Sequence, residues 1–354
     1  MGAIRMLTRC RKGAYRAMTS VDTPYPGTTW QVQPVAPSTG WDLDKLQRAA
    51  AYAQQLGSAA VMVVVDGVPA VAWGAIDQPL NCHSIRKSLL SGLFGISVDA
   101  GRIALPSTLA DLGIDDCAPA LTVQERQATV EQLLMSRSGV YHWANYQPTF
   151  DRSWLPARGT YPPGAFFMYN NWDFNVLGTI YEQATQQGVF AAFEQQIAIP
   201  LQMEDFRLQD TEYVGGSDSI HPAYVFRMSA RDLARYGLLY LRNGRWRDRQ
   251  LIPEAWVRSS TTAYSRALDG RGYGYLWWVA VAGMLLPNVT VGDGSYAAFG
   301  VGGHFMVILP ELQMIIVHRY DTDTAEWEST APAPDAQGTL VHMLLAAYRP
   351  SDTR

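Results

Sequence analysis

The sequence predicts an α+β fold in which an antiparallel sheet is built from both ends of the chain, is flanked by helices, and receives a mainly helical insert. Segments rich in β-branched and apolar residues, typical of strands, occur at residues 59–73 and return at residues 272–319, whereas helical periodicity dominates between them. In addition, the helix that begins near Ser84 has almost no polar face, which indicates burial between two halves of the protein. We therefore expect a basic and proline-rich lead-in at 1–40, a sheet domain made of 41–100 and 261–354, and a helical insert at 101–260.

The composition indicates a globular protein, because 48% of its 354 residues are hydrophobic and 17% are charged. The net charge of −4 offers no basic surface to nucleic acid, so we expect no such partner. Three cysteines and six histidines occur at no spacing typical of metal ligands, and we expect neither a metal nor an organic cofactor.

The first 20 residues are basic and lack the apolar core of a secretory signal, and no apolar segment is long enough to span a membrane. We therefore expect a cytoplasmic protein without a membrane span. The sequence leaves open whether residues 1–20 belong to the mature protein and whether the chain forms a homo-oligomer.

The individual elements follow from apolar periodicity and from turn residues. Asp42 is suited to cap the first helix, and Asp66-Gly67 to join the first two strands in a tight hairpin. In chain order, we expect a helix at 43–56, strands at 59–65 and 68–73, helices at 84–100, 130–136, 173–187, 191–199 and 230–242, strands at 272–282, 297–309 and 313–319, and a final helix at 336–348.

The clearest candidate for a catalytic motif lies at the start of the buried helix. Ser84 and Lys87 are three residues apart, so on a helix the hydroxyl and the amine lie on one face within reach of each other, as a nucleophile and its base require. Burial of the lysine disfavours its charged form and favours its use as a base. An isolated S-x-x-K is weak evidence, and ordinary helix chemistry is the alternative.

Two later stretches could complete a site. Tyr169-Asn170-Asn171 follows a stiff turn and precedes a helix, and a tyrosine near a lysine can relay protons; the alternative is that Asn171 caps the helix and Tyr169 is a packed aromatic. Residues 294–304 are mostly small, so a backbone N–H exposed on this stretch could form an oxyanion hole together with the backbone N–H of Ser84. The alternative is that the stretch is an ordinary glycine-rich strand.

Together, these three motifs resemble those of the serine β-lactamase and penicillin-binding-protein superfamily. Their order and wide spacing are similar to the class C branch, which also holds family VIII carboxylesterases and 6-aminohexanoate-dimer hydrolases. The resemblance covers roughly residues 40 to 348 and implies a β-lactamase/transpeptidase-like fold. The elbow G-x-S-x-G of the α/β-hydrolases is absent.

The resemblance also implies roles for individual residues. Ser84 matches the acylated nucleophile, Lys87 its proton acceptor, and Tyr169 the group that passes the proton to the leaving group and then activates water. Asn171 matches the family asparagine. Counting back from the turn at Leu309-Pro310-Glu311 aligns Ser295-Tyr296-Ala297 with the family's Lys-Thr-Gly, so Ala298 is expected to supply the second N–H of the oxyanion hole, beside that of Ser84.

This alignment departs from the family, because Ser-Tyr-Ala lacks the cation and the hydroxyl that bind a substrate carboxylate. We therefore expect a small-molecule substrate that is a neutral or amphiphilic carboxylic ester or a small amide. A β-lactamase or D-Ala-D-Ala peptidase of class C type, and a non-catalytic binding or regulatory member of the fold, stay open as alternatives. The pocket residues expected beside Asn171 are Tyr141, His142, Trp143, Tyr296 and His304, for each of which a structural role is the alternative.

Overall fold

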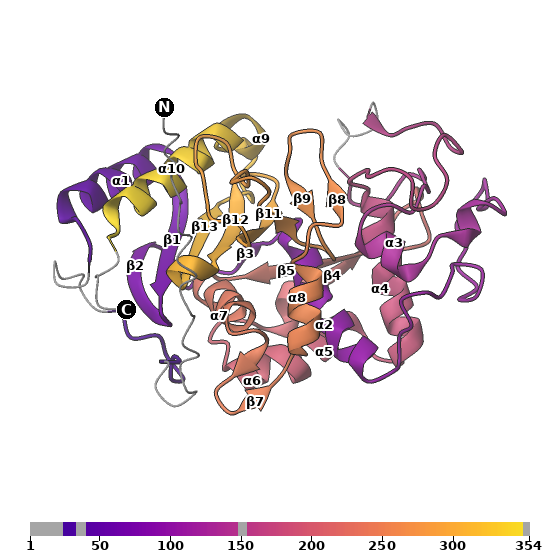
Figure 1. Ribbon diagram of the computed structural model, residues 1–354, viewed down its shortest axis with the longest axis horizontal. Coiled ribbons are helices and arrows are strands. Elements are labelled where there is room, and N and C mark those ends of the chain that lie inside the picture. Colours follow the sequence, from indigo (N-terminus) through magenta and orange to yellow (C-terminus); the bar gives the residue numbers. More distant parts are fainter. Residues whose placement is uncertain (1–23, 33–39, 148–153, 350–354) are drawn as a thin grey trace, which may run out of the picture.

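The computed structural model describes residues 24–32, 40–147 and 154–349 and shows a mixed fold of helices and antiparallel sheets (Figure 1). It confirms the predicted α+β class. The expected lead-in lies largely outside the described residues, but residues 24–32 pack on the protein. Here Trp30 is buried, and its indole Nε1 donates to the Arg231 carbonyl at 3.1 Å.

The main sheet joins the two ends of the chain, as predicted. Strand β1 pairs with β13, so that Val61 lies opposite His318. All the pairings in this sheet are antiparallel. From edge to edge, its strands are β2 (Val68–Gly74), β1 (Ser58–Val65), β13 (Met314–Tyr320), β12 (His304–Leu309), β11 (Tyr296–Gly300), β10 (Trp278–Val279), β9 (Gly272–Tyr273) and β8 (Ser265–Arg266).

Helices α1 (Leu43–Gln55) and α10 (Pro334–Ala347) lie side by side against one face of this sheet (Figure 1). The predicted cap is observed, since the Asp42 carboxylate accepts the Lys45 N–H at 3.1 Å. The predicted hairpin turn between β1 and β2 is observed as well, with Asp66 and Gly67 at φ values of 51° and 79°.

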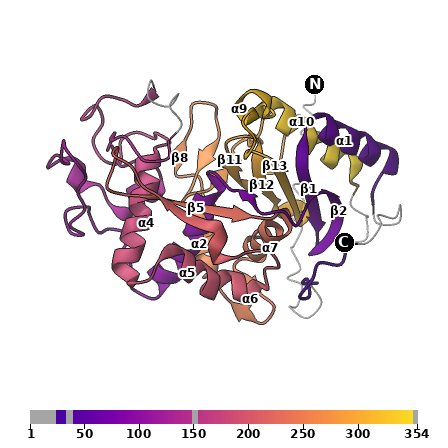
Figure 2. The ribbon, with the colours of Figure 1, turned by 180° about the vertical axis from the view of Figure 1, so that it is seen from behind.

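Helix α2 (Ile85–Asp99) lies beyond the other face of the sheet, between the sheet and the helices α4 (Asn171–Thr185) and α5 (Val189–Phe193) (Figures 1 and 2). Every residue from 85 to 95 is buried, as the lack of a polar face predicted. Gly92 and Gly95 allow this enclosure, because a Cβ at either position would overlap Tyr236 or Trp256. The helix therefore fits its surroundings only with small residues at these two positions.

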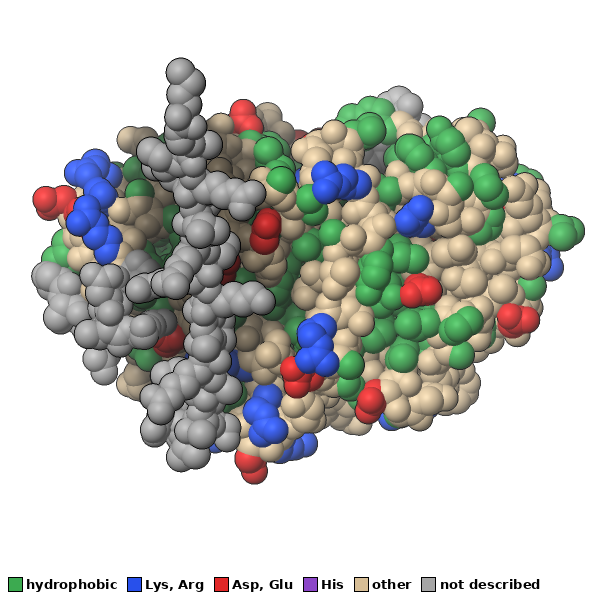
Figure 3. All heavy atoms as spheres, viewed as in Figure 1, with side chains coloured by type: hydrophobic (Ala, Val, Ile, Leu, Met, Phe, Trp, Pro, Cys, Tyr) green, Lys and Arg blue, Asp and Glu red, His purple; other side chains and the backbone are tan. Residues whose placement is uncertain are grey.

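The middle of the chain is mainly helical (Figure 2). None of the helices in the described part of the chain is both long and apolar enough to cross a membrane. On the face drawn in Figure 3, the charged side chains are scattered and form no continuous patch.

The remaining elements are β3 (Leu80–Asn81), α3 (Val130–Leu134), a π-helical turn (Glu194–Ala198), α6 (Ile199–Leu201), β4 (Thr211–Val214), β5 (Ala223–Met228), α7 (Ala230–Leu241), β6 (Arg245–Trp246), β7 (Arg249–Gln250), α8 (Glu254–Ser260) and α9 (Trp327–Thr330), with short 3-10 turns at Glu125–Gln127, Leu208–Asp210 and Pro310–Leu312.

Two of the predicted strands are wrong in extent. The segment 297–309 folds into the hairpin of β11 and β12, because Gly302 and Gly303, at φ values of 84° and 91°, reverse the chain. The segment 272–282 likewise forms two short strands, β9 and β10, since Leu276 adopts a φ of 67° in the turn between them.

The close packing around α2 predicts that a single methyl group added to this helix destabilises the protein. A Cβ at Gly95 would lie 2.4 Å from the Trp256 ring, so Gly95→Ala should lower the free energy of unfolding by about 1–3 kcal/mol. Urea denaturation followed by circular dichroism measures this change. Gly188→Ala is the matched control, because its Cβ would meet no atom closer than 3.7 Å. Equal losses in both variants would contradict the overlap.

A buried histidine on β13 predicts a pH dependence of stability. His318 is fully buried between the Ser58 hydroxyl, 2.7 Å from Nε2, and the Gly303 carbonyl, 2.6 Å from Nδ1, and burial lowers its pKa from 6.5 to about 4. Between these values the unfolded chain binds a proton that the folded chain does not, so stability falls as the pH falls from 6.5 to 4.

We expect His318→Gln to make this dependence shallower by up to about 1.4 kcal/mol per pH unit. Urea unfolding of both proteins at several pH values between 6.5 and 4 measures the two slopes. Parallel curves would contradict this role of His318.

Candidate active site

The two residues of the S-x-x-K motif lie in contact at the start of α2. Strand β3 pairs with β5 and leads the chain into the turn at Cys82 and His83, and Ser84 occupies the N-cap position of the helix. Lys87 is one turn later, and its Nζ donates to the Ser84 Oγ at 2.7 Å. The lysine side chain is only 2% exposed. An amine at this distance can take up the proton of the hydroxyl.

Tyr169 reaches the same amine from the segment before α4. Lys87 Nζ donates to the Tyr169 hydroxyl at 2.7 Å and lies 4.7 Å from the centre of the Phe174 ring. The Tyr169 ring stacks on Trp278, with 5.4 Å between the ring centroids. The three groups Ser84 Oγ, Lys87 Nζ and Tyr169 OH therefore form a continuous hydrogen-bonded chain.

The helix after Tyr169 begins two residues earlier than predicted. Asn170 is its N-cap, and its side chain accepts the Trp172 N–H at 3.1 Å. Asn171 is therefore not the cap, which was the structural alternative for it. It is instead the first residue of α4 and lies in the wall of a cavity beside Ser84.

A cavity of about 880 Å³ opens over Ser84. Its wall combines a polar part near Asn171 and Tyr146 with an apolar part formed by the β10–β11 connection and by the chain around α9. Beside Ser84, Lys87, Tyr169 and Asn171, the lining residues include His83, Arg86, Asp269, Arg271, Trp278, Phe299, Gly300, Val301 and Trp327.

The end of β11 meets the nucleophile turn backbone to backbone. A Cβ at Gly300 would lie 2.7 Å from the Cys82 carbonyl oxygen and 3.3 Å from the His83 Cβ, so only glycine fits there. The residues of this strand that line the cavity are Phe299 and Gly300, followed by Val301 in the turn. The contact places this part of the third motif beside Ser84.

The register expected for the third motif is thus shifted along β11. Tyr296 does not line the cavity; it is buried against Trp277, with ring centroids 5.3 Å apart. Ala298 is buried in the strand and does not line it either. The residues beside the nucleophile are instead the last two of β11 and the first of the turn that follows, because the backbone of Gly300 lies against the Cys82 carbonyl.

Four other pocket predictions also lie outside the cavity lining. Tyr141 is buried against Tyr161, with ring centroids 6.5 Å apart, and burial raises its pKa to about 12. Trp143 and His142 follow it on the same loop, away from the cavity wall. His304 is fully buried one layer behind His83, with 5.3 Å between the two ring centroids.

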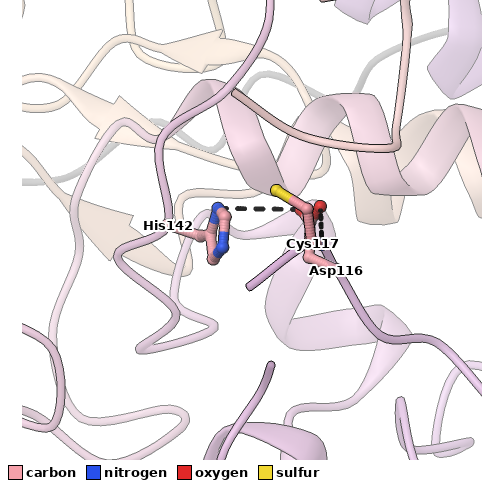
Figure 4. Close-up of side chains that lie close together, drawn as sticks. All are labelled: Asp116, Cys117 and His142. Carbon is pink, nitrogen blue, oxygen red and sulfur yellow. Dashed lines mark hydrogen bonds and ion pairs between the residues drawn. The ribbon is translucent and has the colours of Figure 1, made fainter. Parts of the chain in front are cut away.

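His142 belongs to a separate cluster with Asp116 and Cys117 (Figure 4). One potential ligand atom of each residue lies within 4.8 Å of the others, which raises the question of a metal site. The Asp116 carboxylate, however, already accepts hydrogen bonds from four donors, which are Trp172 Nε1, Ser219 Oγ and the N–H groups of Cys117 and Ile220.

The cysteine of this cluster is equally unsuited to a metal. Burial and the neighbouring Asp116 raise the pKa of the Cys117 thiol, which disfavours the thiolate that a metal requires. The thiol is 3.6 Å from the Asp218 carbonyl and donates to it. The cluster therefore fits a structural junction between the 115–117, 142 and 219–221 segments.

The cationic side chains in the cavity wall, apart from Lys87, are Arg86 and Arg271. Arg271 lies over the Trp278 ring at 4.1 Å, and its Nη2 donates to the Asp269 carboxylate at 2.6 Å. Arg86 is buried, packs 4.4 Å from the centre of the Tyr224 ring and donates to Asn175 Oδ1 at 2.8 Å. One cation is thus neutralised by a carboxylate. The other is buried against an aromatic ring, and its Nη1 has no hydrogen-bond partner among the described residues.

Sequence reasoning missed several residues of this cavity. Arg271 and Asp269 belong to a hairpin loop with no motif, and no sequence signal points to them. His83 and Gly300 did carry a signal, because His83 is adjacent to Ser84 and Gly300 lies in the glycine-rich stretch.

The fold is similar to solved structures of low sequence identity. A candidate 6-aminohexanoate-dimer hydrolase from Bacillus anthracis is 18% identical, with a TM-score of 0.63 over 91% of this chain and 86% of that one. A penicillin-binding protein homologue from Caulobacter crescentus is 14% identical, with a TM-score of 0.63 over 90% of this chain and 100% of the other. A class C β-lactamase mutant is 14% identical, with a TM-score of 0.61 over 85% and 97% of the two chains.

Among proteins of curated function, none matches the sequence significantly. A family model described as Beta-lactamase matches residues 43–328, which is most of the chain and includes Ser84, Lys87, Tyr169 and Gly300. The fold and this match agree with the resemblance seen in the motifs. The chain therefore belongs to the β-lactamase family, within the superfamily of serine β-lactamases and penicillin-binding proteins.

Proposed function

We propose that this protein is a serine hydrolase that cleaves neutral or amphiphilic carboxylic esters, or small amides, through an acyl-enzyme on Ser84. One observation carries the proposal: Lys87 Nζ lies 2.7 Å from both the Ser84 and the Tyr169 hydroxyl, at the wall of the cavity. A packed structural lysine has no need of two hydroxyl partners that both face an open cavity.

The proposed reaction proceeds in two halves. Lys87 takes the proton of Ser84, whose oxygen attacks the substrate carbonyl carbon, and the carbonyl oxygen becomes negatively charged. Tyr169 then donates its proton to the leaving oxygen or nitrogen and recovers one from the Lys87 ammonium. In the second half, water enters, gives a proton back through Tyr169, attacks the acyl carbon and releases the acid, and Ser84 regains its proton.

We further propose that the oxyanion is held by the N–H groups of Ser84 and Val301, in place of the pair with Ala298 expected from the sequence. Val301 follows Gly300, whose backbone lies against the turn before Ser84. Among the described residues, neither N–H has a hydrogen-bond acceptor, so both are available to a substrate oxygen.

The charges around the cavity support a substrate without a carboxylate at the position that β-lactam antibiotics use. The wall beside Ser84 presents the ring of Phe299 where the lactamases have a charged or hydroxyl-bearing motif. Arg271 is held by Asp269, and Arg86 is buried beneath Tyr224. A substrate carboxylate placed at Phe299 would therefore face an aromatic ring, and Arg271 could bind it only by giving up its hydrogen bond to Asp269.

The nucleophile is tested by removing one oxygen atom. Ser84→Ala should abolish the burst of p-nitrophenol from a short-chain p-nitrophenyl ester and lower turnover by at least about 1,000-fold. Intact-mass spectrometry should detect an acyl adduct in the wild type and none in the variant. Ser217→Ala, on an exposed serine, is the control and should behave as the wild type.

Full turnover in Ser84→Ala would contradict the mechanism. If the folded wild type forms no acyl adduct and does not react with a fluorophosphonate probe, the protein is instead a non-catalytic binding or regulatory member.

The substrate preference is tested by comparing a neutral p-nitrophenyl ester with one of equal length that ends in a carboxylate. We expect kcat/KM to be about 10-fold or more higher for the neutral ester, because Phe299 presents an apolar ring to the substrate and Arg271 is already paired with Asp269. Phe299→Lys should narrow this difference, whereas Phe299→Met, the size control, should not. Turnover of nitrocefin at a rate comparable to the neutral ester would refute the preference for esters and favour a β-lactamase.

A further inference from the structure

The residue before the nucleophile is in an unusual conformation. His83 has a φ of 45°, in the left-handed region that costs residues other than glycine about 1–2 kcal/mol. Its backbone N–H donates to Asn81 Oδ1 at 2.9 Å, and its carbonyl accepts the Arg86 N–H at 3.3 Å. A histidine held in this region beside a candidate nucleophile indicates that the surrounding contacts compensate for the strain.

These contacts come mainly from the imidazole ring. Its Nε2 lies 2.8 Å from Thr322 Oγ1, just beyond the end of β13. The ring also packs against His304 and Trp327, with centroids 5.3 and 5.6 Å away. Burial, together with the nearby Arg319 cation, lowers the pKa of His83 to about 4, so the ring is neutral at ordinary assay pH. The nucleophile turn is thus anchored to the sheet through a neutral hydrogen bond.

The conformation of His83 decides where the Ser84 N–H points. In a planar trans peptide the C=O and the N–H lie on opposite sides. Because the His83 carbonyl is used inside the first turn of α2, the N–H of Ser84 is directed away from the helix interior. A rotation of the 83–84 peptide would remove this N–H from the position that the oxyanion of the proposed reaction requires.

We propose that His83 is a positioning residue, whose left-handed backbone and hydrogen bond to Thr322 keep the Ser84 N–H directed at the oxyanion. The inference rests on the proposed hydrolase function. It assigns the ring no proton transfer and no contact with the reacting atoms.

The test removes either the Thr322 hydroxyl or the imidazole ring of His83. Thr322→Val deletes the hydroxyl at nearly constant size, and His83→Gly keeps the left-handed backbone without the ring. Both variants should lower kcat for a p-nitrophenyl ester by about 10–100-fold, with KM changed less than about threefold. Both should also weaken binding of a trifluoromethyl ketone, which mimics the oxyanion, by a similar factor. His83→Gln, whose side-chain amide extends about as far as the imidazole Nε2 and can bond to Thr322, should recover most of the activity.

The chain offers a matched control. Thr179 Oγ1 lies 3.0 Å from His221 Nδ1 in a similar threonine–histidine pair, and neither residue lines the cavity. Thr179→Val should therefore lower stability without changing kcat or the affinity for the ketone. If Thr322→Val behaves in the same way, His83 is merely structural and the inference is overturned.

Different results would refute the hydrolase activity and the positioning role of His83. Absence of an acyl adduct in the folded wild type refutes the hydrolase and the positioning role together. An adduct in the wild type, with unchanged kcat in Thr322→Val and His83→Gly, refutes the positioning role alone.

Discussion

The enclosure of α2 on every side is the constraint on which the rest of the structure depends. The Ser88 and Ser91 hydroxyls donate to the carbonyls of Leu276 and Tyr275 at 2.7 and 2.8 Å, so even the polar atoms of this helix are tied to its neighbours. The Tyr236 hydroxyl in turn donates to the Ser88 carbonyl at 2.8 Å. A helix held in this way cannot rotate or slide, and the side chains at its first turn keep a fixed position relative to the sheet.

The buried amine links three parts of the chain that are distant in sequence. Lys87 belongs to α2, Tyr169 to the segment before α4, and Trp278, against which Tyr169 stacks, to β10. Aromatic packing positions the tyrosine, while the lysine connects it to Ser84. The aromatic residues around the site are therefore as important to its geometry as the polar residues.

Helical geometry predicted the local part of the site, and the family resemblance added Tyr169 and Asn171. Ser84 and Lys87 lie three residues apart on one helix, so helical geometry alone brings them together, and their contact is observed. The residues of β11 that lie beside the nucleophile could not be obtained in this way, because that contact joins segments more than 200 residues apart and depends on the strand pairing of the whole sheet. Likewise, His142 was near a predicted break in the chain, but the four hydrogen bonds of Asp116 organise that loop away from the cavity.

The pairing of β1 with β13 also determines when the protein can complete its fold. Val61 and Val63 are synthesised about 250 residues before their partners in β13, His318 and Ile316. A nascent chain therefore carries β1 as an exposed apolar edge, which is prone to pair with other chains, until β13 has left the ribosome as well. Ser84 and Lys87 are likewise made early, yet the backbone at Gly300 that closes the turn beside them arrives only with the C-terminal strands, so a truncated chain contains the reactive pair without the rest of the site.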